Sequence, residues 1–348
     1  MGDIGGPWLR SPVLFDEEKR ATGVQVQQNG YRKSIKAHNE VIISGGSINS
    51  PQILMLSGIG PKTELEKHKI PVVTANEHVG KHLLDHYWSN LGYTLNNSAA
   101  TLSVTDSEVL RYLEYAIFGT GRLMYTGAEL SASLHTGVLP KTDTPDIQLK
   151  IFVADGWMGK GNCLNLKPEV DKAYDADRLL KPAFSFMSVL QQPLSEGEIT
   201  LASADPEAKP IIDPKYFSNE RDLRAIVEGL KISMKIVNDA SLKKYNPQLS
   251  ELTVPGCENH KKWSDPYLEC LARHRTFTLY HPVSTCRMGL TAETSVVDSR
   301  LRVHGVKKLR VVDGSVFPDH TTGNVNVPIM MVAEKASDMI KEDLLKFN

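Results

Sequence analysis

Hydrophobic and polar residues alternate in the first part of the chain, as they do in strands that bury one face. The alternation runs through residues 21–37, on both sides of Asn29-Gly30. Asn-Gly is the dipeptide most typical of a tight hairpin turn, because both residues tolerate a positive φ. The pattern therefore predicts two antiparallel strands joined at this turn.

A continuous apolar run follows over residues 41–44 and ends at a glycine pair. A short helix is expected next, over residues 50–56, with Pro51 in its first turn and Gly58 as its carboxyl-terminal cap. A strand, a glycine turn and a helix in this order are typical of α/β folds.

The rest of the chain mixes helical periodicity with strand-forming runs. A capping box at 105–108 predicts a helix with apolar residues on one face, which are Val109, Leu110, Leu113, Ala116 and Ile117. Further strands are expected at 146–155, 183–192, 197–203 and 308–314, and further helices at 61–69, 221–238, 267–273 and 328–344.

This order of elements predicts two interleaved substructures, an α/β unit and an α+β unit. The α/β unit is expected to combine residues 1–86 with residues 291–348, so that both ends of the chain contribute to it. Residues 87–290 are expected to form the α+β unit around an antiparallel sheet.

Composition excludes some classes of function. The chain has 348 residues, with 40 basic and 41 acidic side chains and no basic block, which disfavours nucleic acid as a partner. No apolar run approaches the length that a membrane span needs. The first twenty residues lack the features of a signal peptide, although an Asn-x-Ser sequon at Asn96 is typical of secreted proteins.

Four cysteines occur, and none forms a C-x-x-C pair, so zinc and redox motifs are not expected. Cys257 and Cys270 bracket a short polar segment. They either close a loop through a disulfide or remain two unpaired thiols. No metal ligand set is predicted.

Two side chains in the last quarter suit the oxidation of an alcohol. His281 precedes a proline in a loop of small residues, where a stiff backbone can present a base. Asn324 offers an uncharged donor and acceptor that could hold the developing alkoxide. Taken singly, a histidine is more often structural or exposed, and we assign His274, His304 and His320 to that group. The default interpretation of Asn324 alone is a helix cap.

Neighbouring residues suit a flavin. Asn324 and Asn326 precede the last expected helix, whose positive end favours an electron-rich ring. Asp313-Gly314 ends a strand, where backbone amides can approach a ligand closely.

Three segments of the chain resemble the glucose–methanol–choline (GMC) oxidoreductase family, and its insect glucose dehydrogenase-like members most closely. Residues 46–60 (GSINSPQILMLSGIG) are similar to the second signature of the family, and residues 79–86 (VGKHLLDH) to the segment that follows it. The stretches YHPVSTCRMG and VVDGSVFPDHTTGNVNVP are similar to the catalytic region, with the expected spacing between them.

The resemblance implies an FAD-dependent enzyme that transfers hydride from a CH–OH group to the flavin. His281 would be the catalytic base and Asn324 the partner of the alkoxide. The backbone along the flavin would come from Asp313, Gly314, Asn324, Val325 and Asn326. Residues 87–290 would form the substrate domain, and the α/β unit would be a partial Rossmann-like FAD-binding domain.

The chain departs from the family at its beginning. A G-x-G-x-x-G loop in a first βαβ unit should hold the nucleotide, and the G-x-G starts at residues 58, 119 and 159 lack the third glycine. We therefore expect a C-terminal part of a longer, secreted parent. Its alternatives are a short homologue without FAD that acts as a binding or decoy protein, and an unrelated binding module.

Substrate and acceptor stay open at this point. Glucose, an ecdysteroid, choline and an aryl alcohol are all compatible with the sequence as substrates. The electron acceptor is either quinone-like or O₂.

Overall fold

The computed structural model describes residues 12–28, 31–95, 108–124, 130–138, 144–152, 166–175, 183–249 and 253–345. The chain divides into two compact units, and the first contains residues 1–85, 193–218 and 281–348. The second unit contains residues 86–192 and 219–280.

These boundaries differ from the expected ones at two places. Residues 193–218 and 281–290 lie in the first unit and not with the middle of the chain. The reason is backbone pairing: Leu83 pairs with Gly197, and Leu84 pairs with Val283. Both segments are thereby fixed to the end of the first segment.

The described residues of the first unit form four small sheets. The antiparallel sheet β1-β2-β3 contains the expected hairpin, whose turn at Asn29-Gly30 lies outside the described residues. Strands β4 and β15 pair in parallel, with Leu309 opposite Val41. The elements are β1 (Val13–Phe15), β2 (Ala21–Gln28), β3 (Tyr31–Lys36), β4 (Val41–Ile43), α1 (Gly46–Leu56), β5 (Ile59–Gly60), α2 (Lys62–Lys67), β6 (Thr74–Ala75), β11 (Glu198–Thr200), β12 (Ile211–Asp213), β15 (Leu309–Val311), the 3₁₀ turn η3 (Gly314–Val316) and α8 (Asn326–Leu345).

Helix α1 begins four residues earlier than the sequence indicated. Pro51 therefore lies inside the helix and not in its first turn, which corrects the expectation. A proline there leaves the carbonyl four residues before it without a helical donor. That carbonyl belongs to Ser47, and the hydroxyl of Thr285 donates to it at 2.7 Å. Gly58 has a φ of 81° just after the helix, as a carboxyl-terminal cap requires.

A buried arginine fixes the end of α8 to the β4–β15 pair. The Arg310 side chain is 4% exposed and donates to Glu40 at 2.8 Å and to Asp343 at 2.7 Å. Its third nitrogen donates to the carbonyl of Arg300 at 2.6 Å. Each of the three guanidinium nitrogens thus donates to an acceptor.

Glu198 forms a second charged cluster, on β11. Lys215 donates to one carboxylate oxygen at 2.7 Å, and Lys81 forms an ion pair with the other. These hydrogen bonds lower the pKa of Glu198 from 4.5 to about 2. A carboxyl group with a depressed pKa stabilises the fold above its unfolded pKa, and this contribution is lost as the pH falls towards the folded pKa.

We expect Glu198→Gln to make the free energy of unfolding depend less on pH in the acid range. Because the ion pairs lie near the surface, the parent should lose about 1 kcal/mol more than the variant between about pH 5 and pH 3. Chemical denaturation at a series of pH values measures this difference. Glu17→Gln, at an exposed position, is the control. Parallel curves for the parent and Glu198→Gln would contradict the role of Glu198.

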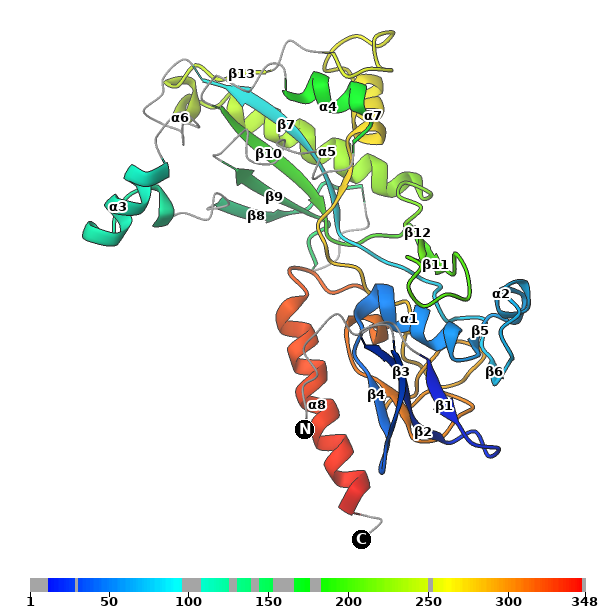
Figure 1. The fold of residues 1–348 in the computed structure, drawn as a ribbon. Helices are drawn as coiled ribbons and strands as arrows, with labels where there is room; N and C mark the ends of the chain where they lie inside the picture. Colours follow the sequence, from blue (N-terminus) through cyan, green and yellow to red (C-terminus); the bar gives the residue numbers. More distant parts are fainter. Residues whose placement is uncertain are drawn as a thin grey trace. The chain divides into compact units, whose positions relative to one another are not determined.

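The second unit is an antiparallel sheet of six strands with helices around it (Figure 1). The strand order is β13-β7-β10-β9-β8, and β14 also pairs with β7. The elements are β7 (Tyr87–Thr94), α3 (Glu108–Phe118), the 3₁₀ turn η2 (Arg122–Met124), β8 (Leu130–Leu134), β9 (Ile147–Phe152), α4 (Pro168–Asp175), β10 (Ala183–Leu190), α5 (Glu220–Val237), α6 (Ala240–Lys243), β13 (Gln248–Leu249), α7 (Asp265–His274) and β14 (Phe277–Thr278).

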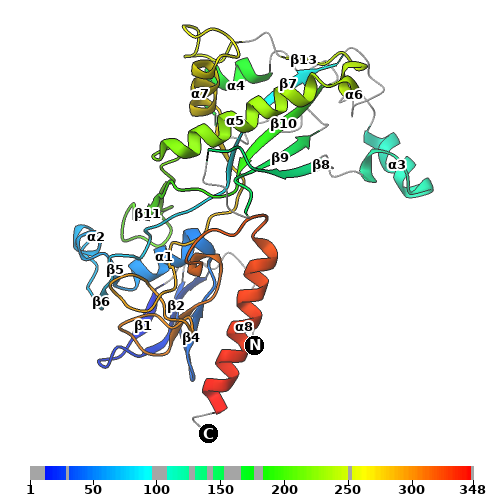
Figure 2. The ribbon, with the colours of Figure 1, turned by 180° about the vertical axis from the view of Figure 1, so that it is seen from behind.

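Helix α5 lies across one face of this sheet, as Figures 1 and 2 show from opposite sides. The approach is close because Gly229 has no side chain: a Cβ there would lie 2.0 Å from the hydroxyl oxygen of Ser188. That hydroxyl donates to the carbonyl of Ile226 at 3.1 Å. The side chain of Ser188 on the sheet therefore contacts the backbone of the helix directly.

Cys257 and Cys270 form a disulfide, which decides the alternative that the sequence left open. The bond closes a loop between residues 13 positions apart beside helix α7. We expect Cys257→Ser with Cys270→Ser to lower the free energy of unfolding by about 3 kcal/mol, since the unfolded chain gains freedom. Denaturation with and without a reducing agent tests this. The reductant should destabilise the parent and leave the double variant unchanged, and an unchanged parent would contradict the prediction.

Helix α3 carries the expected apolar residues, but they face solvent in the described structure, with Val109 66% exposed and Ile117 65%. Residues 105–107 of the predicted capping box lie outside the described part, as does the sequon at Asn96. Among the described residues, no helix combines the length and the apolar character that a membrane crossing requires.

Candidate functional site

The backbone of His281 is held at both its amide and its carbonyl, within the first unit. Its N–H donates to Oδ1 of buried Asp85 at 3.0 Å. Its carbonyl oxygen lies 2.9 Å from Nε2 of His320. The hydroxyl of Tyr216 donates to Oδ2 of Asp85 at 2.5 Å and so fixes the carboxylate. His281 is half-buried, and its ring is carried by a backbone with little freedom to move.

The same loop contains two residues in the left-handed region. Tyr280 and Ser284 have φ values of 62° and 75°. This conformation is uncommon for residues other than glycine, and such strain concentrates at functional sites. His281 lies between the two.

The segment after His281 packs against α1 and η3. Ser47 in the first turn of α1 donates to the carbonyl of Pro282 at 2.6 Å. Further along, the N–H of Cys286 donates to the carbonyl of Ser315 at 2.8 Å. Residues far apart in the sequence thus form one rigid arrangement around the candidate base.

The Asp313 carboxylate holds this arrangement together. It accepts from the N–H of Gly46 at 2.9 Å and from the hydroxyl of Ser50 at 2.5 Å, and so caps the start of α1. Its other oxygen accepts from the N–H of Ser315 at 2.8 Å. The side chain of Asp313 is therefore used within the protein, so a contact with a cofactor would come from the backbone. The neighbouring Gly314 is buried against Ile329.

The other half of the predicted site precedes α8. Asn324 is exposed, and Asn326 is the first residue of the helix, which begins two positions before the expected Pro328. Val325 between them is buried in the hydrophobic core, so only its backbone can meet a cofactor. Gly323 has a φ of 91°, and its Cα faces open space.

Several buried polar atoms in these segments have no hydrogen-bond partner among the described residues, and three of them suit a flavin. They are Oδ1 of Asn49, Oγ of Ser284 and Oγ1 of Thr321. Buried polar atoms in native proteins nearly always find a partner, which is water or a ligand when the protein offers none. An acceptor on α1 and two hydroxyls, one in the His281 loop and one in the segment before α8, are groups that can bond to the polar edge of a flavin ring.

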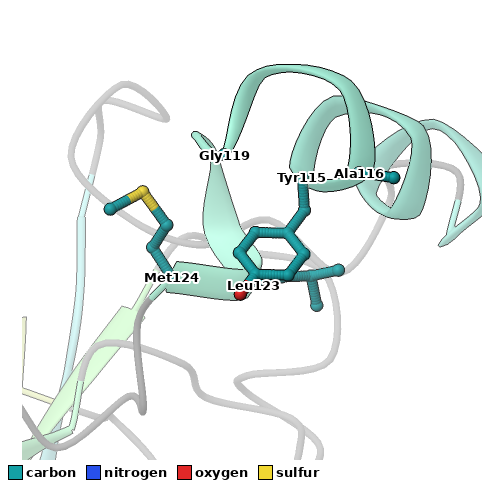
Figure 3. Close-up of a pocket in the computed structure, with 5 residues that line it drawn as sticks. All are labelled: Tyr115, Ala116, Gly119, Leu123 and Met124. Atoms are coloured by element: carbon teal, nitrogen blue, oxygen red, sulfur yellow. The ribbon is translucent and has the colours of Figure 1, made fainter.

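Two other features do not suit this chemistry. A hollow of about 600 Å³ beside α3 is lined by Tyr115, Ala116, Gly119, Leu123 and Met124 (Figure 3). It contains no histidine or carboxylate. Cys257, Cys270 and His274 form the one metal-like group among the described residues, but the disulfide removes both thiolates.

The fold is similar to that of a solved oxidoreductase. Formate oxidase from Aspergillus oryzae superposes with a TM-score of 0.82 at 26% identity, over 98% of this chain and 61% of the oxidase. Two family models, both described as GMC oxidoreductase, match residues 11–88 and 193–333. The chain belongs to the GMC oxidoreductase family, as its motifs indicated.

The most similar curated relatives include dehydrogenases. Glucose dehydrogenase [FAD, quinone] of Drosophila pseudoobscura is 36% identical over 94% of this chain and 51% of its own length. Mitochondrial choline dehydrogenase of the mouse is 36% identical over 96% of this chain and 52% of its own length. The chain therefore spans about half the length of these relatives. FAD, the cofactor expected from the motifs, is the one named for the fly enzyme.

Sequence reasoning missed Asp85 and Tyr216, which position the site, and it placed His320 among the structural or exposed histidines without indicating its contact with His281. Asp85 had a usable signal, because a carboxylate in the apolar run Leu83–Trp88 must find a partner if it is buried. His320 had none, since one histidine among eleven carries no mark of its role.

Proposed function

We propose that this chain carries the base and the alkoxide-binding residue of an FAD-dependent dehydrogenase acting on CH–OH groups. The observation that carries the proposal is the backbone of His281, fixed by Asp85 and His320 inside a strained loop. A general base must keep its position while the proton moves, and such a loop provides that.

FAD, when bound, would accept the hydride from the carbon of the alcohol. His281 would take the hydroxyl proton on its imidazole. The Asn324 amide would donate to the same oxygen and stabilise its developing charge. Asn49, Ser284 and Thr321, with their unpartnered polar atoms, would hold the ring, together with the backbone at Gly314, Val325 and Asn326.

The nucleotide part of FAD has no counterpart among the motifs of this chain. We propose that the first unit corresponds to part of a Rossmann-like FAD-binding domain, and the second to the substrate domain. The parallel pairing of β4 with β15 supports the first assignment. An alcohol or sugar would be the substrate, and a quinone-like acceptor or O₂ would take the electrons.

A binding protein without FAD is the second candidate. Such a protein would need no G-x-G-x-x-G loop, whose backbone amides neutralise the pyrophosphate of FAD. The disulfide supports an oxidising compartment in either case, and hence a secreted product.

Flavin binding by the purified chain separates the two candidates. We expect a yellow protein after incubation with FAD, with a bound-flavin spectrum that survives gel filtration and bleaches when an alcohol is added without an acceptor. Asn49→Ala should weaken retention of the flavin, whereas Asn39→Ala, on a surface loop, should not. A colourless protein after gel filtration would favour the binding protein.

A further inference from the structure

The ring of His320 lies between two carbonyl oxygens. Its Nε2 is 2.9 Å from the oxygen of His281, and its Nδ1 is 2.9 Å from the oxygen of Thr321. A carbonyl oxygen only accepts, so each contact needs a proton on the ring nitrogen. A neutral imidazole has one N–H and makes one of these hydrogen bonds. The imidazolium makes both.

Burial decides which form is present near neutral pH. The pKa of His320 is lowered from its ordinary value, first by burial, while the two carbonyls and the carboxylate of Asp319 act in the opposite direction. The ring is therefore neutral above this lowered pKa, and acid adds the second hydrogen bond. Because the folded pKa is depressed, acid also reduces the overall stability as the ring takes up its proton.

We propose that His320 is a positioning residue for His281, and that protonation of its ring loosens the connection between the two halves of the candidate site, because the buried charge costs more than the second hydrogen bond gains. His320 precedes Asn324 by four positions, so one ring links the backbone of the base to the turn that carries the amide. Pro282 follows His281 with a fixed φ. The imidazole of His281 is therefore aimed by two contacts, from Asp85 and from His320.

Only the description of His281 as the base rests on the proposed function. The connection itself is a property of the chain and can be measured without FAD or substrate. A failure of the flavin experiment would leave it intact, and a failure of the experiment below would leave flavin binding untouched.

Hydrogen exchange at the amides of Val283 and Ser284, which are bonded to Leu84 and Gly314, reports the stability of this loop. After correction for intrinsic rates, we expect protection in the parent to fall by several-fold as the pH falls through the lowered pKa of His320. His320→Gln retains one N–H donor without titrating, so its protection should show no step. His320→Leu should exchange about tenfold faster at both amides, because the neutral hydrogen bond is lost.

His304→Gln is the matched control, because His304 is also half-buried in the first unit but contacts Ser295. It should keep the pH step of the parent. A step that persists in His320→Gln, or an equal loss of protection in His304→Gln, would overturn the proposal. If His320→Leu does not fold, the parent protein alone still tests the proposal, because the NMR chemical shifts of the His320 ring nitrogens report when the ring is protonated. A ring that gains its second proton without any response at Val283 and Ser284 would also overturn it.

Discussion

Arg310→Met is expected to lower the free energy of unfolding by about 3 to 5 kcal/mol. The guanidinium is almost fully buried and is the partner of two carboxylates, Glu40 before β4 and Asp343 near the end of α8. Removing it leaves the half-buried carboxylate of Glu40 poorly solvated, whereas Asp343 keeps its ion pair with Arg300. Urea denaturation followed by circular dichroism gives the value directly.

Arg302→Met is the control for this prediction. Arg302 also pairs with a carboxylate, Asp298, but it is 54% exposed, so its loss should cost less than about 1 kcal/mol. Adding Glu40→Gln and Asp343→Asn to Arg310→Met should restore more than half of the loss, because neutral groups are easier to bury. If Arg310→Met costs no more than the control, then water already solvates the two carboxylates.

His281→Ala is expected to slow flavin reduction by the alcohol by about 10² or more, because general base catalysis typically contributes that much. Stopped-flow mixing of the FAD-loaded chain with the alcohol under anaerobic conditions measures the rate. Flavin retention should be unchanged, because the backbone contacts of His281 to Asp85 and His320 do not use its side chain.

Two comparisons test the assignment of roles. His304→Ala removes a histidine of the same unit and should reduce flavin at the parental rate. Asn324→Ala should slow reduction more than it weakens flavin binding, since its amide is assigned to the oxygen of the substrate. A rate for His281→Ala within a few-fold of the parent would show that the base is another group.

Local patterns in the sequence were sufficient to predict most of the described helices and strands. The hairpin of β2 and β3, helix α5 and the strand pair β4 and β15 all follow from periodicity and turn residues. Strand β7 was not predicted, because almost every residue from Tyr87 to Thr94 is buried. A strand buried on both faces shows no alternation, and its Ser89 and Asn90 resemble loop residues.

The error at α1 has a different origin. Local rules place Pro51 in a first turn, whereas the real helix tolerates it because Thr285 supplies the donor for the orphaned carbonyl. That donor comes from a distant part of the chain, which no local pattern can indicate. Asp85 and Tyr216 were missed, and the contact of His320 with His281 was not indicated, for the same reason: these roles depend on contacts that exist only in three dimensions.

The connection from Asp313 to Gly46 and Ser50 sets an order of events during synthesis. These partners are 267 and 263 positions apart, so this cap of α1 cannot form before Asp313 has been synthesised. Contacts this distant in sequence form late and slowly. A translation product that ended before Asp313 would therefore lack the carboxylate that joins α1 to the rest of the candidate site.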